Sequence, residues 1–243
     1  IWWFPIPKGY LKKIFFASLI ANTLQYSITY TGLNYIDASA AVLLVQTEVP
    51  FGVIFAYFML REKPTIRALI GIAVAFVGVY ILTGSPNLDG KFFGITLTII
   101  GSAIWALGQV IVKPLSKEIN PLALVAWLAL FSGPVLVTLS SIIDGDTIKY
   151  LSEAKFDHWI IAFYIGFIMQ PVTYGCFYYV LKNNPLYKVL PIVTMGIPPT
   201  GLLAAIFLLG EKPTQELFIG GAIIIVGVIL IVFTKNKTEE VEK

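Results

Sequence analysis

The chain has 243 residues, of which 57% are hydrophobic and 13% are charged, and its mean hydropathy is +0.83. Soluble domains carry about 25% charged residues, so this composition indicates an integral membrane protein. The net charge of +3 is too small to indicate a nucleic-acid partner, and one Cys with one His cannot supply the roughly four ligands of a structural zinc site. We therefore expect no metal and no cofactor.

Apolar stretches long enough to cross a bilayer recur along the chain, where a membrane barrel would show strands of about 10 residues with alternating polarity. Pro, Gly, Asn, Asp and Lys separate each stretch from the next. The sequence predicts an all-α integral membrane fold with spans at 13–31, 39–60, 66–83, 92–112, 121–143, 159–181, 187–209 and 216–234.

The basic residues are divided unequally between the two faces on which eight spans place the loops. Side A denotes the face that holds 1–12, 61–65, 113–120, 182–186 and the tail from 235, and side B denotes the opposite face. Side A carries 13 of the 17 Lys and Arg residues, namely Lys8, Lys12, Lys13, Arg61, Lys63, Arg67, Lys113, Lys117, Lys182, Lys188, Lys235, Lys237 and Lys243. Short cytoplasmic loops carry such an excess, so we expect a multi-pass protein of the cell membrane with a cytoplasmic C-terminus.

A short loop occurs twice, as "REKPT" at 61–65 and as "GEKPT" at 210–214. An alignment of 58–84 with 207–233, at an offset of 149 residues, gives 12 identities in 27 positions. A unit of this length that ends near 233 contains five spans. The sequence therefore predicts that 1–84 holds the last three helices of a first half, and that 85–243 holds a five-helix second half with its tail.

A unit with an odd number of spans is inverted when it is duplicated, which places the two copies of the loop on opposite faces. Continued backwards, the period predicts ten spans, of which eight are present here, and an N-terminally incomplete sequence. The alternative is a natural eight-helix protein. Inverted repeats around a midplane site are a recurring design of secondary transporters, although duplication without transport is also consistent with the pattern.

Four sequence stretches carry a family resemblance. "LREKPTIRALIGIAVAFVGVYIL" and "LGEKPTQELFIGGAIIIVGVILI" close the two halves, "SAIWALGQVIVKPL" opens the second, and "YGCFYYVLKNNPL" precedes its fourth span. The chain resembles the drug/metabolite transporter superfamily, in particular its EamA-type members with two five-helix repeats. This resemblance implies transport of small organic solutes by alternating access, often outward. The first two helices of the family, which help to line its central cavity, are absent from this sequence.

Glu48, in "VQTEVPF", is the only charged residue in the middle of any predicted span. A charge there costs about 2.5–3.5 kcal/mol on insertion scales, so such residues face a bundle interior or a water-filled cavity. Glu48 is a candidate for a proton-coupling group or for an anchor of a cationic part of the substrate. The alternative is a neutral Glu that forms a hydrogen bond to a neighbouring helix. The matching position 197 is Ile.

Two predicted spans carry polar and aromatic residues along one helical face. These residues are Asn22, Gln25, Tyr26, Thr29 and Tyr30 in 13–31, and Gln170, Tyr174 and Tyr178 in 159–181. They are candidates for the lining of a permeation cavity, and the alternative is hydrogen bonding between helices. Trp105 and Gln109, at i and i+4 in 92–112, are further candidates.

Two other features allow alternatives. Gly71 and Gly78 match Gly220 and Gly227 at the same offset, and they permit close helix contact either within the bundle or between the two copies of a homodimer. The prolines of "MGIPPTG" at 195–201 indicate either a gating hinge or bent packing.

The sequence favours a secondary transporter that moves small organic metabolites, amino-acid-like or related solutes, with efflux as one direction. The expected partners are the small-molecule substrate, the lipid bilayer, and a proton or another coupling ion. An enzyme is not expected, because the sequence has no P-loop, no H-E-x-x-H motif and no cluster of catalytic groups. The alternative is a non-transporting multi-span membrane protein, such as a receptor or an assembly or scaffold factor.

Overall fold

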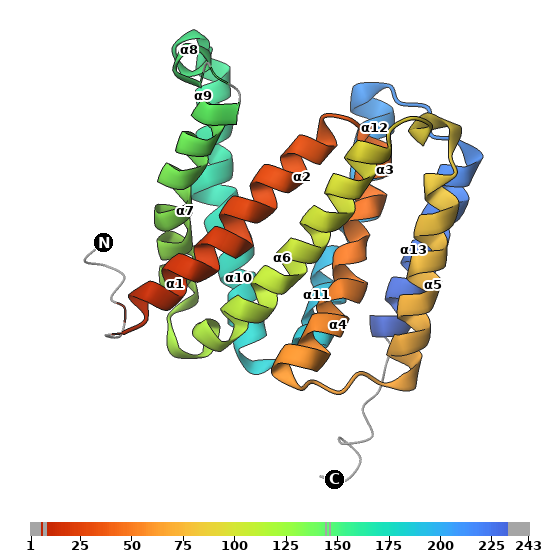
Figure 1. Cartoon of the computed structure of the whole chain (residues 1–243), viewed down its shortest axis with the longest axis horizontal. Helices are drawn as coiled ribbons and strands as arrows, with labels where there is room; N and C mark the ends of the chain where they lie inside the picture. The colour runs from red at the N-terminus through yellow and green to blue at the C-terminus, as the bar shows by residue number, and fades with distance from the viewer. Residues whose placement is uncertain (1–5, 7–8, 144, 146, 233–243) are drawn as a thin grey trace.

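The computed structural model describes residues 6, 9–143, 145 and 147–232, and no strand occurs among them. The predicted cytoplasmic tail from 235 lies outside the described residues. Short connections join the helices, and the bundle is elongated in the plane of Figure 1. The helices are α1 (Leu11–Ser18), α2 (Gln25–Leu33), α3 (Ala38–Leu44), α4 (Glu48–Leu60), α5 (Ile66–Thr83), α6 (Phe92–Glu118), α7 (Pro121–Ile143), α8 (Thr147–Glu153), α9 (Phe156–Phe163), α10 (Gln170–Asn183), α11 (Leu186–Thr194), α12 (Ile197–Leu209) and α13 (Gln215–Val232).

Several of these helices join end to end into longer segments. A π-helical turn, Leu19–Leu24, joins α1 to α2, and a second, Tyr164–Met169, joins α9 to α10. A 3-10 turn, Val45–Thr47, joins α3 to α4. Another 3-10 turn, Pro86–Leu88, lies between α5 and α6.

Seven helical segments of the described chain, from Ala38–Leu60 to Gln215–Val232, are long and apolar enough to cross a membrane. They correspond to seven of the eight predicted spans. The remaining one, 13–31, lies in a segment that is helical from Leu11 to Leu33. Polar residues such as Asn22 and Gln25 lower the mean hydropathy of this segment, which separates it from the other seven. The chain is an all-α integral membrane protein.

Glycines bring α5 and α13 into close contact, and the two helices lie side by side at one end of the molecule (Figure 1). A Cβ added to Gly71 would lie 2.5 Å from the carbonyl oxygen of Gly227, and one added to Gly78 would lie 2.8 Å from that of Gly220. Only residues without a side chain allow this approach. The glycine contact is therefore made within the chain.

The two "EKPT" loops have the same backbone geometry at matching positions. Arg61 (φ 56°) and Gly210 (φ 69°) both adopt the left-handed conformation and end α4 and α12. The following N–H of Glu62 donates to the carbonyl of Ala56 at 3.2 Å, and that of Glu211 donates to the carbonyl of Ala205 at 3.1 Å. These bonds satisfy carbonyl groups at the helix ends and fix the direction of each loop.

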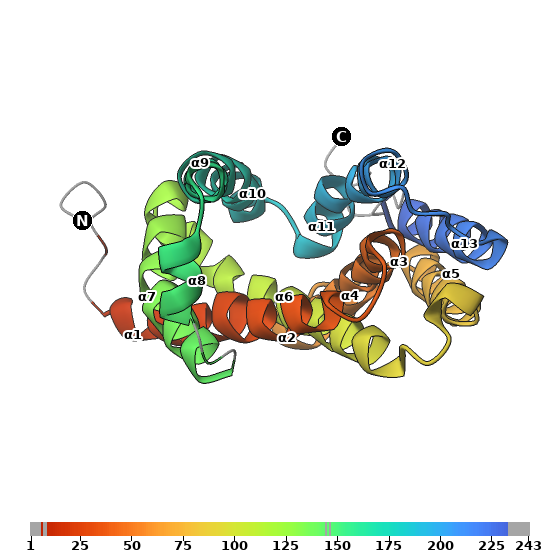
Figure 2. The same cartoon turned by 90° about the horizontal axis from the view of Figure 1, so that it is seen from above.

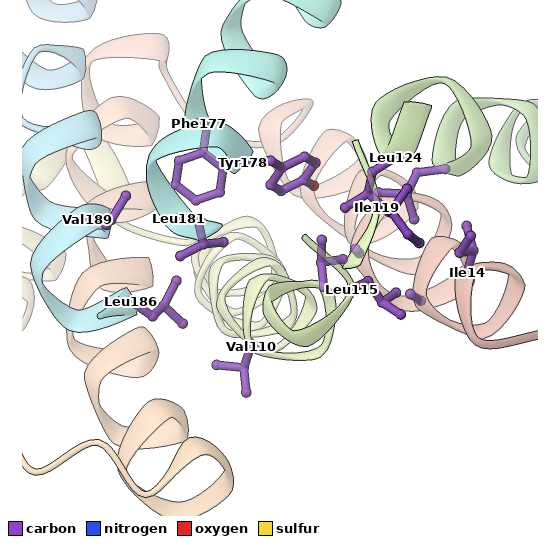
Figure 3. Close-up of a cluster of buried hydrophobic side chains, with 14 of the residues drawn as sticks. Ile14, Val110, Leu115, Ile119, Leu124, Phe177, Tyr178, Leu181, Leu186 and Val189 are labelled. Carbon is purple, nitrogen blue, oxygen red and sulfur yellow. The ribbon is translucent and has the colours of Figure 1, made fainter. Parts of the chain in front are cut away.

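Buried apolar side chains form two clusters. The first joins α1, α6, α7, α10 and α11, and in Figure 3 the Tyr178 ring points toward Leu124 and Ile119. The second joins α3, α4, α5 and α13. Figure 2 shows α2 and α6 in one layer and α10, α11 and α12 in the other.

Candidate functional site

The candidate site begins at a break in the helical segment that carries Glu48. α3 ends at Leu44, a 3-10 turn covers Val45–Thr47, and α4 begins at Glu48. A second break separates α11 from α12, and α12 begins at Ile197, the position that matches Glu48 at the offset of 149. Discontinuous helices of this kind form the central sites of many transporters. The break before α12 lies in "MGIPPTG", where a kink was expected.

The Glu48 side chain is buried inside the helical bundle. It is 4% exposed, and within the described residues its carboxyl group forms no hydrogen bond and no ion pair. The described residues thus supply no hydrogen bond of the kind that the sequence analysis gave as the alternative role of Glu48. A buried carboxyl without a protein partner can bind a proton or an external cation.

Buried amide groups lie on the neighbouring helical segments. Gln46, in the 3-10 turn next to Glu48, is 1% exposed, and neither polar atom of its amide has a hydrogen-bond partner in the part of the chain that is described. Gln109 of α6 is also 1% exposed, and its Oε1 likewise lacks a donor there. Gln25 has one unpartnered atom as well, its Oε1. These amides can donate to or accept from a polar solute.

An aromatic cluster connects the first helical segment, α6 and α10. The Nε2 of Gln170 donates to the hydroxyl oxygen of Tyr26 at 3.0 Å, and the Nε1 of Trp105 donates to that of Tyr174 at 3.2 Å. The rings of Tyr174 and Tyr178 have their centroids 5.9 Å apart. The cluster therefore joins aromatic and hydroxyl groups from three different helical segments.

Glu48 belongs to the same region as the aromatic cluster. Tyr174 lies within electrostatic range of Glu48, Tyr26 and Tyr178. The structure thus brings together Glu48, Tyr26, Trp105, Gln170, Tyr174 and Tyr178 of the predicted site residues.

The other polar and aromatic candidates of the predicted span 13–31 have different surroundings. Nδ2 of Asn22 donates to the hydroxyl of Ser132 on α7 at 3.3 Å, and Nε2 of Gln25 donates to that of Thr29 at 3.0 Å. The bond of Asn22 connects two helices, which is the alternative role that the sequence left open. Tyr30 stacks on Tyr26 with ring centroids 5.6 Å apart, but it is 60% exposed.

Gln46 is a residue of the candidate site that was not predicted from the sequence. It lies two residues before Glu48 in "VQTEVPF", and a regular α-helix would point the two side chains in different directions. A polar residue within one turn of an intramembrane carboxyl was the available signal. Among the residues that the structure describes, no group of three or more His, Cys, Asp or Glu side chains could hold a metal ion.

Comparison with known proteins places this site in a family context. The model of the EamA-like transporter family matches residues 1–84 and 92–233. The chain is 28% identical to a "Probable amino-acid metabolite efflux pump" of Escherichia coli, over 93% of this chain and 78% of that protein. It is 26% identical to an "Uncharacterized transporter" of Clostridium kluyveri, over 97% and 75% of the two chains.

The fold is also similar to that of a solved crystal structure. The TM-score is 0.65 at 14% sequence identity, and the match covers 94% of this chain and 80% of the other. The matching family model and the named relatives indicate membrane transport and no enzymatic activity. The chain belongs to the EamA-like transporter family.

Proposed function

We propose that the chain is a secondary transporter that carries small amine-bearing metabolites, such as amino acids or related solutes, by alternating access. The single observation that carries this proposal is the buried carboxyl group of Glu48 in the membrane-spanning segment Ala38–Leu60, which forms no hydrogen bond or ion pair with any described residue. The printed name of the Escherichia coli relative, an amino-acid metabolite efflux pump, supports the same solute class and an outward direction.

Burial of Glu48 in a membrane span suggests how binding and coupling are linked. A charged side chain at the bilayer centre costs about 2.5–3.5 kcal/mol on insertion scales, and an opposite charge or a proton removes that cost. A substrate ammonium group and a proton therefore compete for the same carboxyl. Competition of this kind couples solute movement to proton movement in the opposite direction.

Other candidate groups on α6, α10 and the 3-10 turn would add recognition of the rest of the solute. The faces of Trp105 and Tyr174 favour a cation by about 0.5–2 kcal/mol, depending on its desolvation. The unpartnered amide atoms of Gln46 and Gln109 supply hydrogen bonds for a carboxylate or another polar group of the solute. Three kinds of contact thus favour an amine-bearing solute with a second polar group.

Alternating access would use the two halves at 1–84 and 85–243 as inverted units, with side A in the cytoplasm. Support for this arrangement comes from the breaks before Glu48 and Ile197, which occur at matching positions of the repeat. Further support comes from the reciprocal glycine contacts of α5 and α13.

The proposal is tested with the Glu48→Gln variant of the full chain in proteoliposomes loaded with radiolabelled amino acids. We expect that an imposed proton gradient drives solute flux in the opposite direction in the wild type. In the Glu48→Gln variant, solute flux should no longer depend on the gradient. Binding should weaken about 10- to 100-fold, because a hydrogen bond to a charged group contributes about 1.5–3 kcal/mol. Glu153→Gln, in the exposed helix α8, is the matched control and should behave as the wild type. Absence of flux for every solute would favour a non-transporting receptor or scaffold, and unchanged flux in Glu48→Gln would remove Glu48 from the site.

A further inference from the structure

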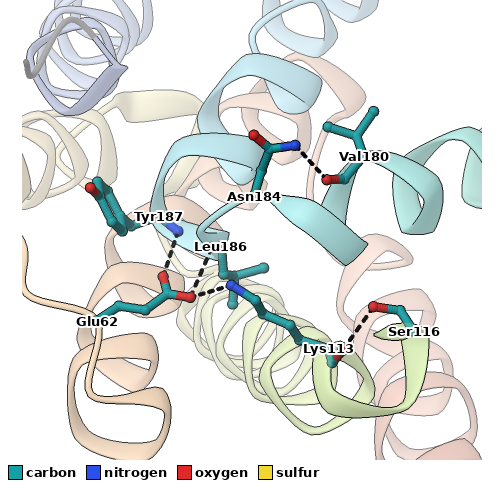
Figure 4. Close-up of polar contacts among 7 residues, drawn as sticks. All are labelled: Glu62, Lys113, Ser116, Val180, Asn184, Leu186 and Tyr187. Carbon is teal, nitrogen blue, oxygen red and sulfur yellow. Dashed lines mark hydrogen bonds and ion pairs between the residues drawn. The ribbon is translucent and has the colours of Figure 1, made fainter. Parts of the chain in front are cut away.

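The carboxylate of Glu62 joins three separate parts of the chain on side A. Glu62 lies in the loop between α4 and α5, and its two oxygens accept the N–H groups of Leu186 and Tyr187 at 3.1 and 3.3 Å (Figure 4). These two residues begin α11, where a negative charge is stabilised by the helix dipole. Lys113 of α6 forms an ion pair with the same carboxylate.

The ion pair of Glu62 is largely removed from water. The side chains of Glu62 and Lys113 are 13% and 9% exposed. Figure 4 shows the Lys113 ammonium group directed at the carboxylate, on the side away from Tyr187. Loss of one partner of such a pair leaves the other charge buried and uncompensated, which opposes its separation.

Glu211 makes the corresponding contact on side B. It occupies the position of Glu62 in the second "EKPT" loop, and its two oxygens accept the N–H groups of Ala38 and Ser39 at 2.8 and 2.9 Å. These residues begin α3. The first "EKPT" loop therefore holds the first turn of α11, in the second half of the chain, and the second loop holds the first turn of α3, in the first half. The partial burial of Glu211 raises its pKa, but hydrogen bonding from Ser39 and Ala38 and the charge of Lys91 lower it more, so the pKa lies below its usual value.

The two contacts differ in strength. Glu62 has a buried lysine in direct contact, whereas Glu211 interacts with Lys91 only through space, since the Lys91 ammonium group donates to Asp37 at 3.1 Å. The contact on side A should therefore be harder to break than the contact on side B. The two contacts share one backbone geometry, so the charge partner is the main difference between them.

Both contacts act on the helical segments that are broken at the site. Glu211 holds the start of α3, which leads through the 3-10 turn to Glu48, and Glu62 holds the start of α11, which leads to the break before α12. We propose that Glu62 and Glu211 are positioning residues that latch the two faces of the transporter. Release of Glu62 frees α11 and opens side A, and release of Glu211 frees α3 and opens side B. This inference rests on the proposed function, because only an alternating transporter needs two separable latches.

Buried cysteines at matching positions can report the opening of each face. Ala40 in the first turn of α3 and Val189 in the first turn of α11 are separated by the offset of 149, and both are buried. Each is changed to Cys in a full-length Cys176→Ser background, and the rate of alkylation by N-ethylmaleimide is measured in nanodiscs without solute. We expect Glu62→Gln to accelerate the reaction at 189 about tenfold and to leave 40 unchanged, and Glu211→Gln to do the reverse. Tenfold corresponds to about 1.4 kcal/mol.

Lys113→Gln provides an independent variant that keeps the carboxylate. It should accelerate alkylation at position 189 as Glu62→Gln does and should not affect position 40. An equal acceleration of alkylation at both cysteines in these variants would show that the glutamates only stabilise the fold. No acceleration at either cysteine would show that the glutamates do not keep the two faces closed. Either result overturns the proposal. Flux is measured separately, so a chain that shows selective opening without flux contradicts the proposed function and leaves the latches supported.

Discussion

Gly78 provides a direct test of the packing between α5 and α13. A Cβ added there would lie 2.7 Å from the backbone N of Ile224 and 2.8 Å from the carbonyl oxygen of Gly220, whereas ordinary contacts begin at 3.4 Å. Gly78→Ala therefore requires the two backbones to separate by roughly 0.6 Å, a gap that forfeits a quarter to a half of each local dispersion contact.

The expected loss of stability combines two opposing terms. Overpacking against a rigid backbone lowers the free energy of unfolding by about 1–3 kcal/mol. The change from Gly to Ala inside a helix raises it by about 0.5–1 kcal/mol. The matched control is Gly166→Ala in the π-helical turn, because an added Cβ meets nothing within 4 Å there. This control should gain about 0.5–1 kcal/mol, so the difference between the two variants isolates the packing term.

The measurement is reversible unfolding of the full chain in bicelles by added dodecyl sulfate, followed by the fluorescence of the five Trp residues. We expect Gly78→Ala to unfold at a lower detergent fraction than the wild type, and Gly166→Ala to unfold at a higher one. If both variants were equally stable, α5 and α13 would not be in the close contact described here, and the reasoning from glycine positions would fail.

Two further predictions concern the "EKPT" loops. Arg61→Gly should stabilise the chain by about 1–2 kcal/mol in the same unfolding assay, because it removes a side chain from the left-handed region, and Gly210→Ala should destabilise it by a similar amount. If the two substitutions changed the stability in the same direction, residues 61 and 210 would not both adopt the left-handed conformation. Because the pKa of Glu211 is lowered from 4.5 in the folded chain, its stabilisation is complete above pH 4.5 and is lost as the pH falls through the folded value. Glu211→Gln should reduce the fall of stability below pH 4.5, and an unchanged acid profile would show that the carboxylate is not held by α3.

Hydropathy predicted the positions of the membrane spans because the apolar runs are long and the loops between them are short. The predicted 66–83 and 121–143 coincide with the helices Ile66–Thr83 and Pro121–Ile143. The segment at 13–31 was predicted in the same way, as an apolar stretch, although its composition is less apolar than that of the other spans. Local irregularities were not predicted. A π-helical turn at Leu19–Leu24 depends on packing against α6 and α7, which the periodicity of one segment does not contain.

The candidate site was predicted in part. An intramembrane carboxyl is rare enough to be recognised from sequence, so Glu48 was identified, and helical spacing identified Tyr174 and Tyr178. The contact between Tyr26 and Gln170 could not be predicted, because it depends on how two helices far apart in the chain pack. The contacts of Glu62 were not predicted for a similar reason. A glutamate in a charged loop is normally solvated, and only the fold places α11 and Lys113 against it.

The matching breaks before Glu48 and Ile197 differ in one respect, the presence of an ionisable side chain. Both breaks give a helical segment a place to bend, but only one of them carries an ionisable group. The solute would therefore keep a single charged contact while either face opens, and it would not need to be handed from one carboxyl to another.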